Sequence, residues 1–154
     1  MLPKSVLVVC YGNTCRSPVG EYLLRHFQKD TGGNVTITSA GLHPSFNKIA
    51  SNSENFLALR GISYDDFGPH RITRALIEQY DRILVMEQYM QREIEANFCQ
   101  GRPDLAQKIV MWSEYAGESG DVEDPYMNGE KAYFRILDII ERQAQKIIEK
   151  WNGE

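Results

Sequence analysis

The chain contains little cysteine, no long apolar run and no excess of positive charge, and each shortage excludes a class of protein. Only three of its 154 residues are cysteine, too few for a disulfide-stabilised secreted scaffold, so reduced thiols are expected. No apolar run approaches the roughly 20 residues of a membrane-spanning helix. The formal net charge of −4 does not favour general binding to nucleic acid or to a membrane surface. An anionic substrate would therefore need a local positive site.

The chain also lacks internal repeats, low-complexity tracts and any linker between domains. Its length predicts a single domain, residues 1–154, with one sizeable core. The hydrophobic content of 42% and the charged content of 25% are ordinary for a globular protein. The N-terminal stretch MLPKSVLVVCYGN has neither the long apolar region nor the cleavage site of a signal peptide, so we expect a cytoplasmic protein.

Strand and helix patterns alternate along the chain. The first helix is expected to begin at Ser17-Pro18, with Ser17 as the N-cap. The last helix is expected to be long and amphipathic, with an apolar side that runs from Tyr133 to Trp151. Because strands alternate with helices, we expect an α/β, three-layer fold with a central, mainly parallel four-stranded sheet flanked by helices. The expected strands are 5–9, 35–38, 80–86 and 108–112, and the other expected helices are 50–59, 73–79 and 87–97.

The most informative stretch is VVCYGNTCRSPVGEYLLRHF, which places a C-x5-R-S turn, Cys10 to Ser17, between a strand and a helix. Ligands of open α/β sheets bind beyond the carboxyl ends of strands. Backbone N–H groups in such a turn, together with the helix N-terminus, bind anions. Gly12 and Asn13 can adopt the positive φ that a tight loop needs, and Arg16 can bind phosphate oxygens with two donors. The turn therefore predicts a phosphate-binding loop after the first strand.

Cys10 is the predicted nucleophile of this loop. Thiols at helix N-termini or beside cations have pKa values of about 3.5–7.5, and a thiolate facing an anion site can attack phosphorus. Ser17 is placed to hydrogen-bond the sulfur and ease its departure in a second step. A bare C-x5-R pattern often arises by chance, and a cysteine at a strand end is usually a packing residue. The strand before it and the Ser-Pro helix start after it favour the catalytic interpretation.

The acidic loop EDPYMNG contains a candidate general acid. Asp124 precedes Pro125, which restricts it to an extended conformation. A carboxylic acid that faces a bound phosphate dianion retains its proton more readily and can protonate a leaving group. Asp-Pro is also common turn chemistry, and Glu123 and Asp121 are alternative acids in the same loop.

Taken together, these motifs resemble the low-molecular-weight protein tyrosine phosphatases. VVCYGNTCRSP is similar to that family's V-C-x-G-N-x-C-R-S-P loop, and EDPY is similar to its late Asp-Pro-Tyr loop. ITSAGL and YDRILVME resemble strands of the family, so the similarity spans essentially the whole chain. The resemblance implies a phosphoric monoester hydrolase that cleaves phosphotyrosine through a phosphocysteine intermediate.

The resemblance also implies a role for each matching residue. Cys10 would be the nucleophile, Arg16 would bind phosphate and stabilise the transition state, and Asp124 would protonate the phenolate and then activate water. Asn13, Ser17 and Ser39 would brace the loop. The substrate-binding residues would be Tyr11, Gly12, Asn13, Thr14, Cys15, Ser17, Phe46 and Tyr126.

Cys15 matches the family's second cysteine, which can form a protective disulfide with Cys10 on oxidation. Such a bridge requires a suitable Cα separation. The resemblance implies no cofactor and no metal, and the sequence has no His/Cys spacing typical of a metal site.

Three segments depart from the family pattern. PHRIT is shorter than the family's corresponding segment, so either His70 is the bracing histidine or Arg71 replaces the family's arginine. HPSFNK falls at a variable wall of the cleft, where Phe46 either lines a phosphotyrosine pocket or packs beneath the loop. Tyr126 matches an aromatic wall, and Met127 stands where some members have a second tyrosine.

Two other functions are alternatives to this one. A thioredoxin-coupled arsenate reductase uses the same anion loop but needs further thiols to relay a disulfide, and only Cys99 lies outside the loop. A non-catalytic phosphate-binding or redox-sensing module would have lost the nucleophile, the arginine or the acid, and all three are present.

The resemblance leaves the physiological substrate open. Bacterial members oppose tyrosine kinases of polysaccharide export, which makes such a kinase a candidate phosphotyrosine substrate, whereas eukaryotic members are similar as well. The family is mostly monomeric with weak self-association, so a monomer or weak dimer is expected.

Overall fold

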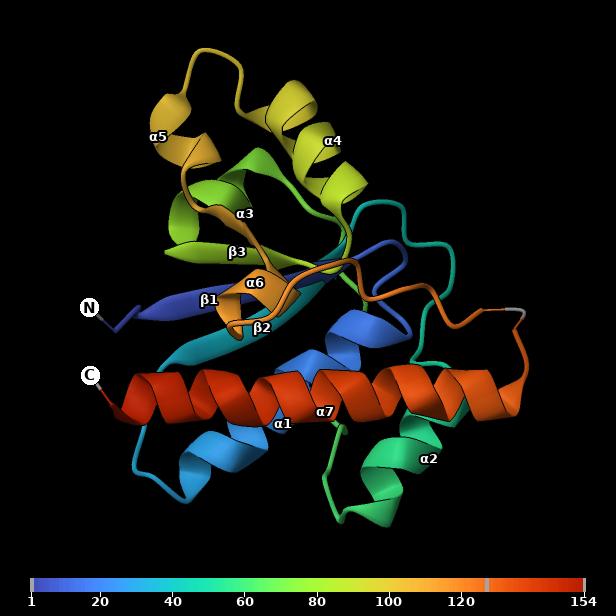
Figure 1. Cartoon of the computed structure of the whole chain (residues 1–154). Coiled ribbons are helices and arrows are strands. Elements are labelled where there is room, and N and C mark those ends of the chain that lie inside the picture. Colours follow the sequence, from blue (N-terminus) through green and yellow to red (C-terminus); the bar gives the residue numbers. More distant parts are fainter. Residues whose placement is uncertain (1, 127, 154) are drawn as a thin grey trace.

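The computed structural model describes residues 2–126 and 128–153, and its centre is a four-stranded sheet (Figure 1). The strands follow the order β2-β1-β3-β4, and every neighbouring pair is parallel. The predicted α/β fold with a parallel sheet and a loop after the first strand is confirmed. The strands are β1 (Ser5–Cys10), β2 (Thr36–Gly41), β3 (Arg82–Val85) and β4 (Ile109–Met111).

Helices cover both faces of the sheet and complete the three layers. Figure 1 shows α1, α2 and α7 below the sheet and α3, α4 and α5 above it. Within the described residues, none of the helices has the length and apolarity needed to cross a membrane. The helices are α1 (Arg16–Lys29), α2 (Ser51–Leu59), α3 (Arg74–Gln79), α4 (Gln88–Phe98), α5 (Pro103–Ala106), α6 (Trp112–Tyr115) and α7 (Glu130–Asn152).

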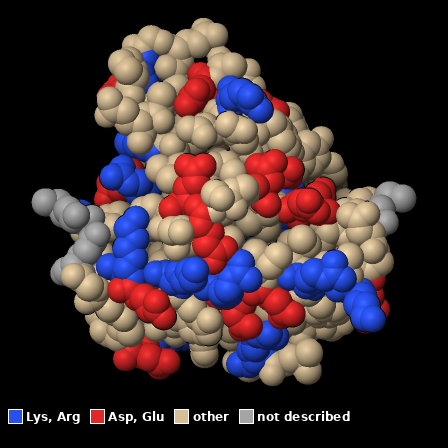
Figure 2. Space-filling model, in the orientation of Figure 1, with Lys and Arg blue, Asp and Glu red and all other residues tan. Residues whose placement is uncertain are grey.

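The core forms between the apolar strands and the apolar side of α7. Val6 to Val9 of β1 are fully buried, as expected for a strand that lies inside a parallel sheet with helices on both faces. The predicted apolar side of α7 is buried from Tyr133 to Trp151, and this helix packs along α1. Figure 2 shows acidic and basic side chains interspersed over the face that includes α7.

The start of α1 differs from the prediction. The N-cap is Cys15, and the helix begins at Arg16, so Ser17 lies inside the first turn. Its hydroxyl contacts the Cys10 sulfur rather than the free amides of the helix. Pro18 still lies in the first turn, where the N–H that it lacks would have had no partner within the helix.

Several element boundaries were also predicted wrongly. β2 extends to Gly41, β3 is shorter than predicted, and the one-turn helices α5 and α6 were not predicted. Trp112 begins α6 instead of ending a strand, and it is fully buried. Leu59, the last residue of α2, is 81% exposed, because α2 contacts the core through Phe56 and Leu57.

Candidate active site

The loop between β1 and α1 is held by hydrogen bonds to its carbonyl groups. The carbonyls of Cys10, Tyr11 and Thr14 accept from the N–H groups of Leu42, His43 and Ala50 at 2.8–3.1 Å. Within the described part of the chain, no acceptor contacts the N–H groups of residues 11 to 15. The loop therefore retains a row of backbone donors, which is the arrangement of an anion-binding site.

Asn13 fixes the shape of this loop. Its φ of 56° is the left-handed conformation that asparagine tolerates better than most residues, whereas Gly12 has no positive φ. The Asn13 Nδ2 donates to Ser17 Oγ and Ser39 Oγ, both at 2.9 Å. Its Oδ1 accepts from the backbone N–H of His70 at 2.8 Å. Asn13 is fully buried, so these bonds satisfy an amide group that has left water.

The Cys10 sulfur lies at the end of a buried polar network. It is 3.0 Å from Ser17 Oγ, which already accepts from Asn13, so the hydroxyl proton of Ser17 can point to the sulfur. Ser39 Oγ donates to Glu21 Oε1 at 2.5 Å. Burial raises the pKa of Glu21 to about 7, although Ser39 and Arg25 oppose the shift. The network thus joins the sulfur to a buried carboxyl group on α1.

The Arg16 guanidinium group has one edge that is held by hydrogen bonds and another, free edge with donors that are unpaired among the described residues. Its side chain is almost fully buried, and Nη1 donates to Glu87 Oε1 at 2.5 Å and to the Val122 carbonyl at 2.7 Å. No described residue accepts a hydrogen bond from Nε, and Nη2 lies 3.9 Å from Asp124 Oδ2. Burial alone would lower the pKa of Arg16, but Cys10 and Glu87 raise it overall. The guanidinium keeps donors available for an anion.

Glu87 was not identified from the sequence. It lies two residues beyond the end of β3, and β3 is a parallel neighbour of β1. Because the carboxyl ends of parallel strands meet at one edge of the sheet, the stretch YDRILVME carried the necessary signal. Reading the first polar residue after each predicted strand would have placed this carboxylate beside the loop.

Among the three candidate acids, Asp124 is the one that lines the same cavity as Cys10. Its Oδ1 accepts from the Tyr126 N–H at 3.0 Å, which fixes the turn, and its side chain is half exposed. Asp121 instead accepts from the Gln88 N–H at the start of α4, and neither Asp121 nor Glu123 lines the cavity. The geometry therefore favours Asp124 over the two alternative acids.

The cavity above Cys10 has a volume of about 270 Å³. Tyr11 and His43 form one wall with ring centroids 5.2 Å apart, and His43 Nε2 lies 2.7 Å from Glu93 Oε2. Phe46 and Tyr126 stand at the rim, 66% and 63% exposed, so the alternative that Phe46 packs beneath the loop is wrong. Met127 lies outside the described residues.

His70 and Arg71 both lie beside the loop, and each donates a hydrogen bond there. The exposed His70 supplies its backbone N–H to Asn13, and Arg71 Nη1 donates to the Leu42 carbonyl at 3.1 Å. In the described residues, neither side chain joins the network of Asn13, Ser17 and Ser39.

All three cysteines are free thiols. Burial raises the pKa of Cys15, although hydrogen bonding with Tyr133 and Thr14 opposes the shift, so this second thiol is protonated near neutral pH. Over residues 2–126 and 128–153, no group of three or more His, Cys, Asp or Glu side chains could hold a metal ion.

Comparisons with known proteins agree over nearly the whole chain. The family model for low molecular weight phosphotyrosine protein phosphatase matches residues 5–154. The protein-tyrosine-phosphatase Wzb of Salmonella typhi is 31% identical and aligns over 98% of this chain and 96% of its own. The crystal structure of Wzb from Escherichia coli K30 with sulphate is 28% identical, with a TM-score of 0.83 and coverage of 97% and 99%. The YwlE arginine phosphatase of Geobacillus stearothermophilus is 25% identical, with a TM-score of 0.86 and coverage of 98% and 94%.

Proposed function

The chain belongs to the low molecular weight phosphotyrosine protein phosphatase family, and from this membership we propose how its own residues hydrolyse phosphotyrosine monoesters. The observation that carries the assignment is the position of Cys10. Its sulfur lies at the base of a loop of free backbone donors, 3.0 Å from the Ser17 hydroxyl. The free edge of Arg16 belongs to the same cavity.

In the first step the Cys10 thiolate attacks phosphorus while the bond from phosphorus to the phenolic oxygen breaks. Arg16 and the loop amides bind the phosphoryl oxygens and stabilise the charge of the transition state. Asp124 gives its proton to the departing phenolate, which leaves as tyrosine. The product of this step is a phosphocysteine, and Asp124 is left as a carboxylate.

In the second step that carboxylate takes a proton from water as the water oxygen attacks phosphorus. The S–P bond breaks, inorganic phosphate leaves, and Cys10 returns to the thiolate that the Ser17 hydroxyl stabilises. The two steps restore every group, so no cofactor is needed. Tyr11, Phe46 and Tyr126 would contact the phenyl ring, because they line the walls and rim of the cavity.

A phosphotyrosine protein is the proposed substrate, in agreement with relatives named protein-tyrosine-phosphatases, and a bacterial tyrosine kinase stays one candidate. The similarity to an arginine phosphatase adds phosphoarginine as a second candidate substrate. We place the enzyme in the cytoplasm, which the three free thiols support.

Arsenate reduction is not favoured. Glu87, the N-cap of α4, contacts Arg16, whereas Cys99 caps the opposite end of this helix. The 11 residues between them span about 16 Å. A disulfide needs Cα atoms within about 7 Å, so Cys99 cannot relay electrons from the loop without a large rearrangement.

The substrate class is tested by measuring kcat/KM for matched phosphotyrosine, phosphoserine and phosphoarginine peptides, with thiol-dependent arsenate reduction run alongside. Phosphotyrosine should be the preferred substrate. A preference for phosphoarginine would show that phosphoarginine is the substrate in place of phosphotyrosine. Arsenate turnover without ester hydrolysis would overturn the proposal.

Variants test the assigned roles. Cys10→Ser should abolish turnover and still bind inorganic phosphate, because the loop amides and Arg16 remain. Asp124→Ala should lower kcat/KM, which reports the first step, by about 10²- to 10⁴-fold for phosphotyrosine and much less for p-nitrophenyl phosphate, whose leaving group needs no proton. Glu123→Gln is the matched control and should behave like the parent. Parent-like hydrolysis by Cys10→Ser and Asp124→Ala would contradict the roles.

A further inference from the structure

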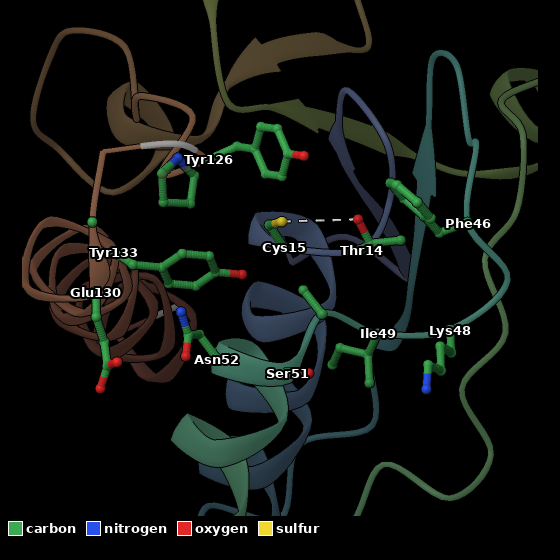
Figure 3. A pocket seen from close by; sticks show the side chains of 13 residues that line it. Thr14, Cys15, Phe46, Lys48, Ile49, Ser51, Asn52, Tyr126, Glu130 and Tyr133 are labelled. Carbon is green, nitrogen blue, oxygen red and sulfur yellow. Dashed lines mark hydrogen bonds between the residues drawn. The ribbon is translucent and has the colours of Figure 1, made fainter.

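A second cavity adjoins the catalytic cavity on the side of α2 and α7 (Figure 3). Its volume is about 610 Å³, compared with about 270 Å³ above Cys10. The two cavities share four lining residues: Thr14, Cys15, Phe46 and Tyr126. The second cavity is therefore continuous with the first, and the exposed aromatic side chains of Phe46 and Tyr126 stand between them.

The surface of the second cavity is mainly apolar. Ile49, Ala50 and Pro125 line it together with the ring of Tyr133, whose hydroxyl already pairs with Ser53 Oγ at 2.7 Å. Lys48 and Glu130 lie at opposite edges in Figure 3. An apolar hollow between two opposite charges suits an apolar side chain carried by a polar main chain.

The position of the cavity indicates which chain would occupy it. If phosphotyrosine reaches Cys10, its ring passes between Phe46 and Tyr126, and the substrate main chain must cross the rim there. The Cα atom of the next residue lies about 3.8 Å away, above the shared wall. Resting on the proposed function, we propose that the second cavity binds an apolar side chain directly flanking phosphotyrosine and thereby selects among protein substrates.

The first measurement uses the parent enzyme and three phosphotyrosine peptides that differ only in the two flanking residues, which are leucine, alanine or glutamate. The leucine peptide should exceed the alanine peptide by about tenfold in kcat/KM, and the glutamate peptide should not. Equal values for leucine and alanine would overturn the inference.

Variants then locate the preference. Asn52 points toward the cavity in Figure 3, so Asn52→Phe should fill it and bring the leucine-to-alanine ratio close to one. Asn55→Phe adds the same ring to an exposed position of the same helix and should keep the tenfold ratio. Because each ratio is taken within one variant, a general loss of activity cancels. A leucine-to-alanine ratio that stays near ten in Asn52→Phe would show that another part of the surface causes the preference, and it would overturn the inference.

The parent ratio alone decides the outcome if Asn52→Phe does not fold. Hydrolysis of p-nitrophenyl phosphate distinguishes a failure of the subsite from a failure of the proposed function. Turnover of this small ester without any flanking preference defeats only the subsite, whereas no turnover of the ester or of any peptide defeats the proposed function and the subsite with it.

Discussion

At the scale of single residues, the position of one guanidinium group depends on a distant carboxylate. Arg16 is buried, and Glu87 is the acidic side chain that contacts it within hydrogen-bond distance. Removing one partner of a buried ion pair is costly because the other charge is left uncompensated. We therefore expect Glu87 to act as a positioning residue, since it holds one edge of the Arg16 guanidinium group.

Glu87→Ala should lower kcat/KM for an aryl phosphate by roughly 10- to 100-fold, because small displacements of a positioned group are costly in rate. Inhibition by inorganic phosphate should weaken in parallel, since the same group binds the product. Glu87→Gln keeps an oxygen that accepts from Arg16 and should recover part of the loss. Urea unfolding of each variant separates the effect on the site from an effect on stability. An Ala variant with parent kinetics would show that Val122 alone positions Arg16.

At the scale of secondary-structure elements, the end of β2 sets the space that the phosphate loop occupies. Gly41 is the last residue of β2, and a Cβ atom there would lie 2.8 Å from Asn13 N and from Gly12 C. Its φ is not positive, so the requirement for glycine comes from the close approach of the loop. The strand and the loop can be this close only because this position has no side chain.

Gly41→Ala should push the loop away from β2 and disturb the amides that face the phosphate. We expect a large fall in kcat/KM together with a loss of about 1–3 kcal/mol in the free energy of unfolding, measured by aryl phosphate kinetics and urea unfolding. Gly68→Ala is the matched control, because its Cβ meets no atom within 4 Å and its φ is not positive. Equal behaviour of the two variants would contradict the packing argument.

At the scale of the whole molecule, a buried carboxyl group makes stability depend on pH. Glu21 lies on α1, where Ser39 of β2 donates to it and Arg25 lies 2.7 Å away, while Asp66 opposes its ionisation. Burial raises its pKa from 4.5 to about 7. The folded protein therefore holds a proton that the unfolded chain releases between these two values, so the stabilisation is complete below about pH 4.5 and is lost as pH rises to about 7.

Glu21→Gln removes this titration and keeps an acceptor for Ser39. The parent should lose about 3 kcal/mol more than the variant between pH 4.5 and 7.5, measured as the free energy of urea unfolding at several pH values. Comparing the two proteins cancels the contributions of all other titrating groups. Parallel curves would show that Glu21 has the same pKa in the folded and unfolded states, which would contradict the upward shift.

The sequence alone determined the fold class and predicted where the core of the site lies. Alternating strands and helices specified a parallel sheet, and the proposed nucleophile, the loop and the arginine lie within eight consecutive residues. A local stretch of this kind can be interpreted without coordinates, because a strand, a turn and a helix start already fix its shape. Predictions of helix and strand boundaries were wrong where a side chain makes another contact. At Ser17, for example, the hydroxyl contacts the Cys10 sulfur instead of capping α1.

Only the tertiary structure decided what surrounds that loop. The partners of Arg16 lie 71 and 106 residues away, and the backbone donor to Asn13 lies 57 residues away. The second cavity forms where segments before α2 and at the start of α7 meet the loop. Such contacts depend on strand order and on the packing of helices against the sheet, and no pattern of neighbouring residues specifies the distance between side chains so far apart in the chain.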